Sequence, residues 1–130
     1  MRSAEAASSS SAARVTPTAL SESAVGVTRV TTETGKTTCN VYVDRVECQS
    51  GAFGKNYRAP SGEPANGFVY RGGRVNWTYG NMAVTWPATV IHYGNTYSAF
   101  GWTIEASSRM TVFGREGHGV IVDVTKTSTF

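Results

Sequence analysis

Residues 37–49, which read TTCNVYVDRVECQ, decide the fold of this chain. A turn centred on Val43-Asp44 folds this stretch into a β-hairpin in which Cys39 lies opposite Cys48. Because side chains alternate between the two faces of a strand, the cysteines share one apolar face with the paired Val41 and Val46. The other face carries the pairs Asn40–Glu47 and Tyr42–Arg45. Val43-Asp44 is not a favoured dipeptide for a two-residue turn, so a four-residue loop with the same pairing is the alternative.

The cysteine pair of this hairpin predicts a disulfide bond. In a two-residue hairpin Cys39 and Cys48 fall at a non-hydrogen-bonded site, where Cα atoms lie about 4.5 Å apart. That distance is inside the window of about 4.4–6.8 Å that a disulfide needs. A disulfide implies an oxidising compartment. The alternatives are two buried reduced cysteines in a cytosolic protein, or a redox or metal-binding pair.

Further strands follow on the C-terminal side. Residues 67–79 predict a second hairpin that turns at Gly72-Gly73, a dipeptide suited to positive φ angles. One face of this hairpin carries aromatic residues and valine, and the other carries Arg71 and Arg74. A third hairpin spans 110–124 across a loop at residues 114–117.

Two more segments show strand patterns. Residues 96–106 alternate, with Phe100, Trp102 and Ile104 on one side, and are expected to form one strand. Pro87 interrupts the run 82–93, which is therefore an edge strand, a bulge or two short strands.

The composition divides the chain of 130 residues into two parts. Residues 1–23 are rich in Ala, Ser and Thr, contain neither Gly nor an aromatic residue, and predict a flexible tail with a short helix around 4–13. Residues 24–130 consist of short β-branched and aromatic runs separated by turn residues. We predict an all-β fold for them, a single antiparallel β-sandwich or barrel-like domain.

Charge and hydropathy exclude several classes of protein. Twelve Lys and Arg against nine Asp and Glu give a net charge of +3, which is too mild for the basic stripe of a nucleic-acid binder. No apolar run approaches the roughly 20 residues that a membrane-spanning helix needs.

The N-terminus lacks the apolar region of a secretory signal, but Ala4-Glu5-Ala6 resembles a signal-peptidase site. We therefore expect a secreted or envelope-associated protein whose signal peptide has been removed.

The two histidines, His92 and His118, are the candidates for catalysis. Neither lies at a metal-ligand spacing such as H-E-x-x-H, and no nucleophile elbow, P-loop or dinucleotide fingerprint is present. The sequence therefore predicts no metal, no cofactor and no catalytic residue. A small hydrolase that uses His118 or His92 with a carboxylate stays as an alternative.

The second hairpin carries the candidate binding residues. Arg71 and Arg74 lie opposite each other beside its turn, where facing like charges are mildly destabilising, and either a solvated tip or an anionic partner explains them. Tyr70 and Trp77 are expected to be exposed aromatic residues beside them, and His118 lies between two glycines at a loop edge. The expected partner is an envelope polymer, a lipid headgroup or an acidic protein.

Several short segments resemble small secreted two-cysteine β-rich proteins of actinobacteria, of the mycobacterial type. The segments are 38–42, 46–49, 75–77, 93–97, 101–104 and 117–119. The resemblance implies a secreted address and an envelope context, and it carries over no catalytic residue. The approach to Gly117-His118-Gly119 is shorter here than in those proteins.

Together these observations predict a secreted or envelope-associated, non-enzymatic binding module. A structural subunit that assembles through an edge strand is the second alternative beside the hydrolase.

Overall fold

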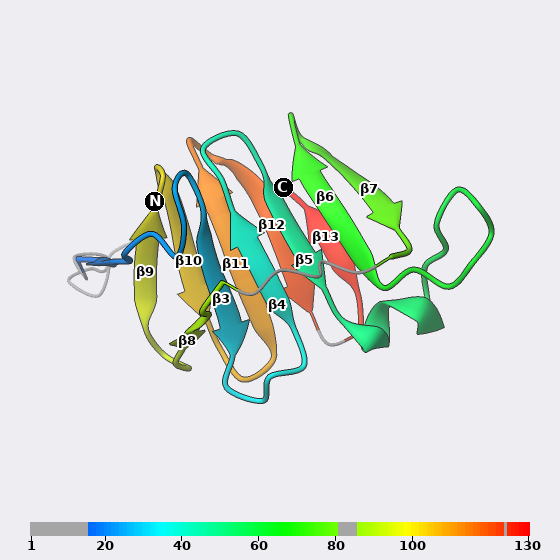
Figure 1. Ribbon diagram of the computed structural model, residues 1–130, viewed down its shortest axis with the longest axis horizontal. Coiled ribbons are helices and arrows are strands. Elements are labelled where there is room, and N and C mark those ends of the chain that lie inside the picture. The colour runs from blue at the N-terminus through cyan, green and yellow to red at the C-terminus, as the bar shows by residue number, and fades with distance from the viewer. Residues whose placement is uncertain (1–15, 81–85, 124) are drawn as a thin grey trace, which may run out of the picture.

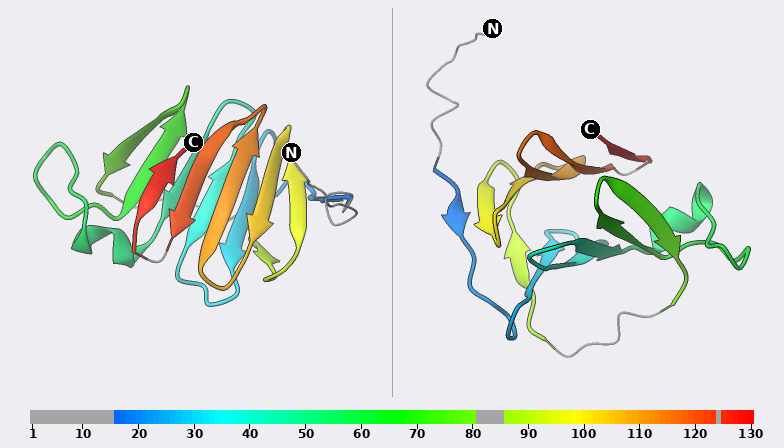
Figure 2. Two further views of the ribbon diagram at one scale, coloured as in Figure 1. Left: turned by 180° about the vertical axis from the view of Figure 1, so that it is seen from behind. Right: turned by 90° about the horizontal axis from the view of Figure 1, so that it is seen from above.

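The computed structural model describes residues 16–80, 86–123 and 125–130, and these form an all-β sandwich. Two six-stranded sheets pack face to face, which the view from above shows edge-on (Figures 1 and 2). The predicted all-β sandwich is therefore confirmed. The helix expected around residues 4–13 lies outside the described residues.

The front sheet of Figure 1 has the order β7-β6-β5-β4-β3-β8. Its strands are β3 (Thr28–Thr32), β4 (Thr38–Val41), β5 (Val46–Gln49), β6 (Gly67–Arg71), β7 (Arg74–Thr78) and β8 (Thr89–Ile91). A 3₁₀ helix, η2 (Gly51–Lys55), follows β5.

The back sheet has the order β13-β12-β11-β10-β9-β2. Its strands are β2 (Thr18–Ala19), β9 (Thr96–Ala99), β10 (Trp102–Ala106), β11 (Met110–Arg115), β12 (His118–Asp123) and β13 (Thr127–Thr129). Neighbouring strands are antiparallel, except that β2 pairs with β9 and β8 pairs with β3 in parallel at the sheet edges.

The first predicted hairpin is confirmed in register. Cys39 pairs with Cys48 and Val41 with Val46, and the Tyr42 N–H donates to the Arg45 carbonyl at 2.9 Å. Because β4 ends at Val41 and β5 begins at Val46, the connection is the four-residue loop 42–45, which was the alternative with the same pairing. Cys39 and Cys48 form the disulfide, with their Cα atoms 4.0 Å apart, and no free cysteine remains.

The second predicted hairpin is confirmed as well. Arg71 pairs with Arg74, and the turn residues Gly72 and Gly73 have φ angles of 59° and 82°. These angles lie in the left-handed region that glycine adopts without a steric cost, which explains the dipeptide.

Two predicted segments fold differently. Residues 96–106 were expected to form one strand, but Phe100 and Gly101 adopt positive φ angles and turn the chain between β9 and β10. The loop expected at 114–117 is shorter, because β11 continues to Arg115 and the turn consists of Glu116-Gly117 alone. The alternating pattern hid the first turn, since Phe100 fits the apolar period on either side of it.

The structure also defines two short edge strands, one within the predicted tail and one after Pro87. β2 lies within residues 1–23, which the composition assigned to the tail, and Leu20 continues the pairing with a hydrogen bond to Ser98. β8 follows Pro87 and forms an edge of the front sheet, as one of the alternatives for that segment predicted.

The core lies between the two sheets. Its fully buried members include Phe68, Val41 and Val46 from the front sheet and Ile104 and Phe113 from the back sheet. Burial of these apolar side chains is the main favourable term in folding.

Because most neighbouring strands are antiparallel, successive turns alternate between the two ends of the sandwich. One end, which we call the tip end, carries the turns at Val43-Asp44, Gly72-Gly73, Phe100-Gly101 and Glu116-Gly117. The opposite end, the base end, carries the connection between β3 and β4, η2 and the turn between β10 and β11.

Candidate functional site

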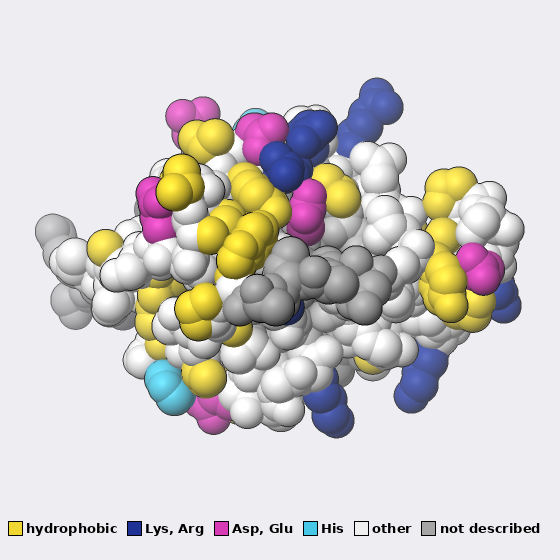
Figure 3. Space-filling model, in the orientation of Figure 1, with side chains coloured by type: hydrophobic (Ala, Val, Ile, Leu, Met, Phe, Trp, Pro, Cys, Tyr) yellow, Lys and Arg dark blue, Asp and Glu magenta, His cyan; other side chains and the backbone are white. Residues whose placement is uncertain are grey.

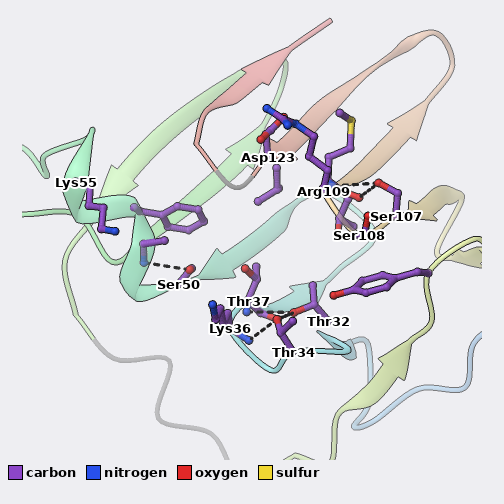
Figure 4. A pocket seen from close by; sticks show the side chains of 16 residues that line it. Thr32, Thr34, Lys36, Thr37, Ser50, Lys55, Ser107, Ser108, Arg109 and Asp123 are labelled. Carbon is purple, nitrogen blue, oxygen red and sulfur yellow. Dashed lines mark hydrogen bonds and ion pairs between the residues drawn. The ribbon is translucent and has the colours of Figure 1, made fainter.

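A cavity of about 380 Å³ opens between the sheets at the base end. Its walls come from five parts of the chain: the β3–β4 turn, η2 with the residue before it, the β8–β9 connection, the β10–β11 turn with the start of β11, and the end of β12 (Figure 4). We call it the basal cavity. It is lined by Thr32, Thr34, Lys36, Thr37, Ser50, Ala52, Phe53, Lys55, Tyr93, Ser107, Ser108, Arg109, Met110, Thr111, Val122 and Asp123.

Three cations stand around the basal cavity. Lys36 comes from the β3–β4 turn, Lys55 from the last turn of η2 and Arg109 from the β10–β11 turn, and Figure 4 shows them on different sides of the opening. Lys36 and Lys55 are exposed and form no ion pair with any carboxylate in the described ranges. Both ammonium groups are therefore available to a ligand.

Arg109 differs from the two lysines because it already has a partner. Its Nε lies 3.3 Å from Oδ2 of Asp123, whose side chain is 17% exposed. Asp123 also accepts a hydrogen bond from the Thr125 N–H. The arginine is thus fixed against the end of β12, and the cavity keeps an excess of positive charge.

Hydroxyl groups form much of the remaining lining. Thr111 is 5% exposed, and its hydroxyl makes no hydrogen bond within the described residues. Ser50 is equally buried, and its Oγ accepts from the Ala52 N–H at 3.2 Å, which leaves its own proton free to be donated. Both hydroxyls line the cavity and can each donate a proton, so they suit a ligand that supplies oxygen acceptors.

The turns that carry these groups are held by their own side chains. Ser107 Oγ accepts from the Met110 N–H and donates to the Met110 carbonyl, which closes the β10–β11 turn. Thr32 Oγ1 lies 3.3 Å from Thr34 Oγ1 and accepts from the Thr37 N–H. The cavity walls are therefore ordered before any ligand binds, which reduces the entropic cost of binding.

The residues predicted as one binding patch are divided by the strand geometry. Tyr70 and Arg71 are adjacent on β6 and therefore point to opposite faces. Arg71 and Arg74 are exposed, and Arg71 Nη2 lies 3.4 Å from Oδ2 of Asp44. As the parity of the hairpin predicts, the two arginines and the Tyr70 ring do not share one surface.

The two aromatic residues of that patch are also not exposed rings on which a ligand could stack. Tyr70 is 3% exposed, so the expectation that it is exposed is wrong. Trp77 is half-buried and stacks on Tyr57 with ring centroids 3.9 Å apart, and its edges pack against Phe53 and Phe68. Both rings belong to the core or its margin, which is the usual place of aromatic residues on strands.

The histidines lie at opposite ends of the sandwich. His118 is exposed and follows the Glu116-Gly117 turn at the tip end. His92 Nδ1 lies 3.4 Å from Oε2 of Glu33, and this carboxylate also accepts from the Tyr93 N–H beside the basal cavity. In the described part of the chain neither imidazole makes a hydrogen bond to a serine or threonine hydroxyl.

A charged cluster covers the front sheet near its tip. Arg45 contacts Glu47 and Asp44 at 2.7 and 3.0 Å, and its guanidinium lies 3.7 Å from the centre of the Tyr42 ring. The hydrogen bond that Arg45 Nε donates to Glu47 is the largest cause that raises the pKa of Arg45 above its ordinary value. Figure 3 shows this face, where basic side chains stand at the margins rather than in one stripe.

Within residues 16–80, 86–123 and 125–130, no group of three or more His, Cys, Asp or Glu side chains is placed to hold a metal ion. None of the helices there is both long enough and apolar enough to cross a membrane.

Sequence reasoning missed the basal cavity. Lys36, Ser50, Lys55 and Arg109 are distant in sequence and fit no known motif. The usable signal is their position, since each lies in a connection at the same end of the sandwich. Comparison with protein-family models, with curated proteins and with solved structures gave no match to this chain.

Proposed function

We propose that this protein is a secreted or envelope-associated binding module that holds a phosphate-bearing polymer in its basal cavity. The observation that carries the proposal is the pair of ammonium groups without an ion pair in the described ranges, Lys36 and Lys55, at a cavity that the hydroxyl of Thr111 also lines. The volume of about 380 Å³ lies in the range of small-ligand pockets, which is about 300–1,000 Å³.

The chemistry of the lining favours phosphate among anions. Lysine binds phosphate as a compact point charge, whereas planar carboxylate recognition favours a free arginine fork. Arg109 is the arginine of this cavity, and its Nε is engaged with Asp123. The hydroxyls of Ser50 and Thr111 add donors for phosphate or sugar oxygens.

The cellular address rests on the disulfide. Disulfides persist in oxidising compartments, so the Cys39–Cys48 bond points to an extracytoplasmic location. An envelope polymer that carries phosphodiesters is the anionic partner within reach there. The resemblance to secreted actinobacterial proteins supports the same address.

The proposal is tested by calorimetric titration with poly(glycerol phosphate) at low and high salt. Replacing both lysines, Lys36→Ala with Lys55→Ala, is expected to weaken binding at least tenfold at low salt, because two charge-assisted contacts are lost. High salt should weaken binding of the unmodified protein, since it screens exposed charges. A neutral polymer, dextran, should show no binding.

Two control variants locate the site. Lys126→Ala removes an exposed cation from the neighbouring β12–β13 connection that does not line the cavity, and it should leave the affinity within twofold. Arg71→Ala with Arg74→Ala should reduce the affinity less than the cavity pair does. If the two tip arginines are required and the two lysines are not, the ligand lies on the β6–β7 hairpin and the proposal is wrong.

A further inference from the structure

A second cleft, separate from the basal cavity, opens at the tip end. Its volume is about 380 Å³, and three of the four tip turns supply residues to its lining. We call it the tip cleft. It is lined by Asp44, Tyr70, Gly72, Gly73, Trp102, Arg115, Glu116 and His118.

Arg115 is the cation of the tip cleft, and it is held in one position. Its guanidinium lies 4.1 Å from the centre of the Trp102 ring and donates a hydrogen bond to the Phe100 carbonyl. Trp102 is itself fixed, because its indole N–H donates to the Tyr42 carbonyl at 2.8 Å. Arg115 is half-buried, yet it forms no ion pair with a carboxylate in the described ranges.

Tyr70 is a second polar group of the tip cleft that lacks a partner within the described residues. Its side chain is 3% exposed, and its hydroxyl makes no hydrogen bond with the described residues. In the described residues, the side-chain polar atom that is fully enclosed and has no hydrogen-bond partner is Oγ1 of Thr127. The unpartnered Tyr70 hydroxyl is therefore not fully enclosed, and it reaches the open space of the cleft. A buried phenol whose polar tip meets a cleft with an unpaired guanidinium is placed to bind an oxygen ligand.

The rim of the cleft limits the charge of the ligand. Glu116 stands at the back-sheet side and Asp44 at the front-sheet side. Glu116 would repel a phosphate dianion, whereas Asp44 is already paired with Arg45 and Arg71. Both carboxylates can accept hydrogen bonds from hydroxyl groups. A single carboxylate that carries neighbouring hydroxyls satisfies Arg115, Tyr70 and the rim together.

The floor of the cleft favours a sugar over a peptide as the ligand. Tyr70 and Trp102 are both at least 96% buried, and Arg115 covers the Trp102 ring. The other lining residues are polar or glycine, so the described lining offers no open apolar pocket for an amino-acid side chain. A sugar ring carries hydroxyls around its circumference and matches such a lining.

We propose that the tip cleft is a binding site for an acidic sugar, with its carboxylate on Arg115 and the Tyr70 hydroxyl. This site is independent of the phosphate site at the base end, and either can fail without the other.

The test follows backbone and indole ¹H–¹⁵N NMR signals of the full chain during titration with D-glucuronate. Saturable shifts at Tyr70, Arg115 and the Trp102 indole are expected, and D-glucose should bind at least tenfold more weakly because it lacks the carboxylate. Tyr70→Phe should weaken glucuronate binding at least tenfold, which is the loss of one hydrogen bond to a charged group. Its thermal unfolding should match that of the unmodified protein.

Tyr79→Phe is the matched control, because Tyr79 is 55% exposed and lies outside the cleft. It should leave glucuronate binding unchanged. Arg115→Lys keeps the charge but loses the planar fork, and it should weaken binding at least tenfold. The proposal is overturned if glucuronate gives no saturable shift, if Tyr70→Phe binds as tightly as the unmodified protein, or if glycylglycine or inorganic phosphate binds more tightly than glucuronate.

Discussion

At the residue scale, Gly119 is a position where the back sheet tolerates no side chain. It pairs with Gly114 across β11 and β12, and the Phe130 ring lies over both glycines. A Cβ at Gly119 would lie 2.1 Å from the Phe113 carbonyl oxygen and 2.7 Å from Cζ of Phe130. An aromatic ring that covers paired glycines restores the packing that the glycines lack, which explains why the chain places Phe130 there.

We expect Gly119→Ala to lower the free energy of unfolding by about 2–3 kcal/mol or more, because the clash is with backbone and cannot be relieved by a rotamer change. Urea unfolding monitored by tryptophan fluorescence measures this loss. Gly51→Ala is the control, since a Cβ at Gly51 meets no atom within 4 Å, and its stability should change by less than about 0.5 kcal/mol. Equal stability of the two variants would contradict the packing described for Phe130.

At the element scale, the β4–β5 hairpin joins the disulfide to the core. Cys39 and Cys48 are both less than 4% exposed and share the inward face with Val41 and Val46. Replacing both cysteines by alanine removes the cross-link that restricts the unfolded chain. For so short a loop the expected loss is about 2–3 kcal/mol of unfolding free energy, with the β-sheet signal in circular dichroism retained.

The native protein should weigh two hydrogens less than its reduced form and take up no alkylating reagent before reduction. Urea titrations of the oxidised protein and of the double alanine variant give the free-energy difference. A native chain that reacts with two alkyl groups would show that the cysteines are thiols and would remove the argument for an oxidising compartment.

The elements show what sequence can and cannot predict. Register followed from parity in the Cys39–Cys48 and Gly72-Gly73 hairpins, because an apolar face and a turn dipeptide fix the pairing together. The turn at Phe100-Gly101 was missed, since an aromatic residue at a φ of 51° carries no turn signal. The parallel pairs that involve β2 and β8 depend on contacts between segments far apart in sequence.

At the scale of the whole molecule, both candidate sites lie at the ends of the sandwich. Each is assembled from turns that become neighbours only when the two sheets pack, so neither has a contiguous motif. Tyr70 and His118 were predicted from sequence and do line the tip cleft, but the residues that give it chemistry include Arg115, which the sequence did not single out. The turns at each end could be grouped from sequence only by knowing which strands are antiparallel neighbours.

The most direct test of the account is to measure where on the protein a phosphate-bearing oligomer binds. A titration of the ¹⁵N-labelled protein with a short glycerol phosphate oligomer maps the binding surface residue by residue. We expect saturable shifts at Lys36, Ser50, Lys55 and Thr111, with the tip end unaffected. Shifts centred on Arg71 and Arg74, or no saturable shift at the base end, would contradict the assignment of the basal cavity as the functional site.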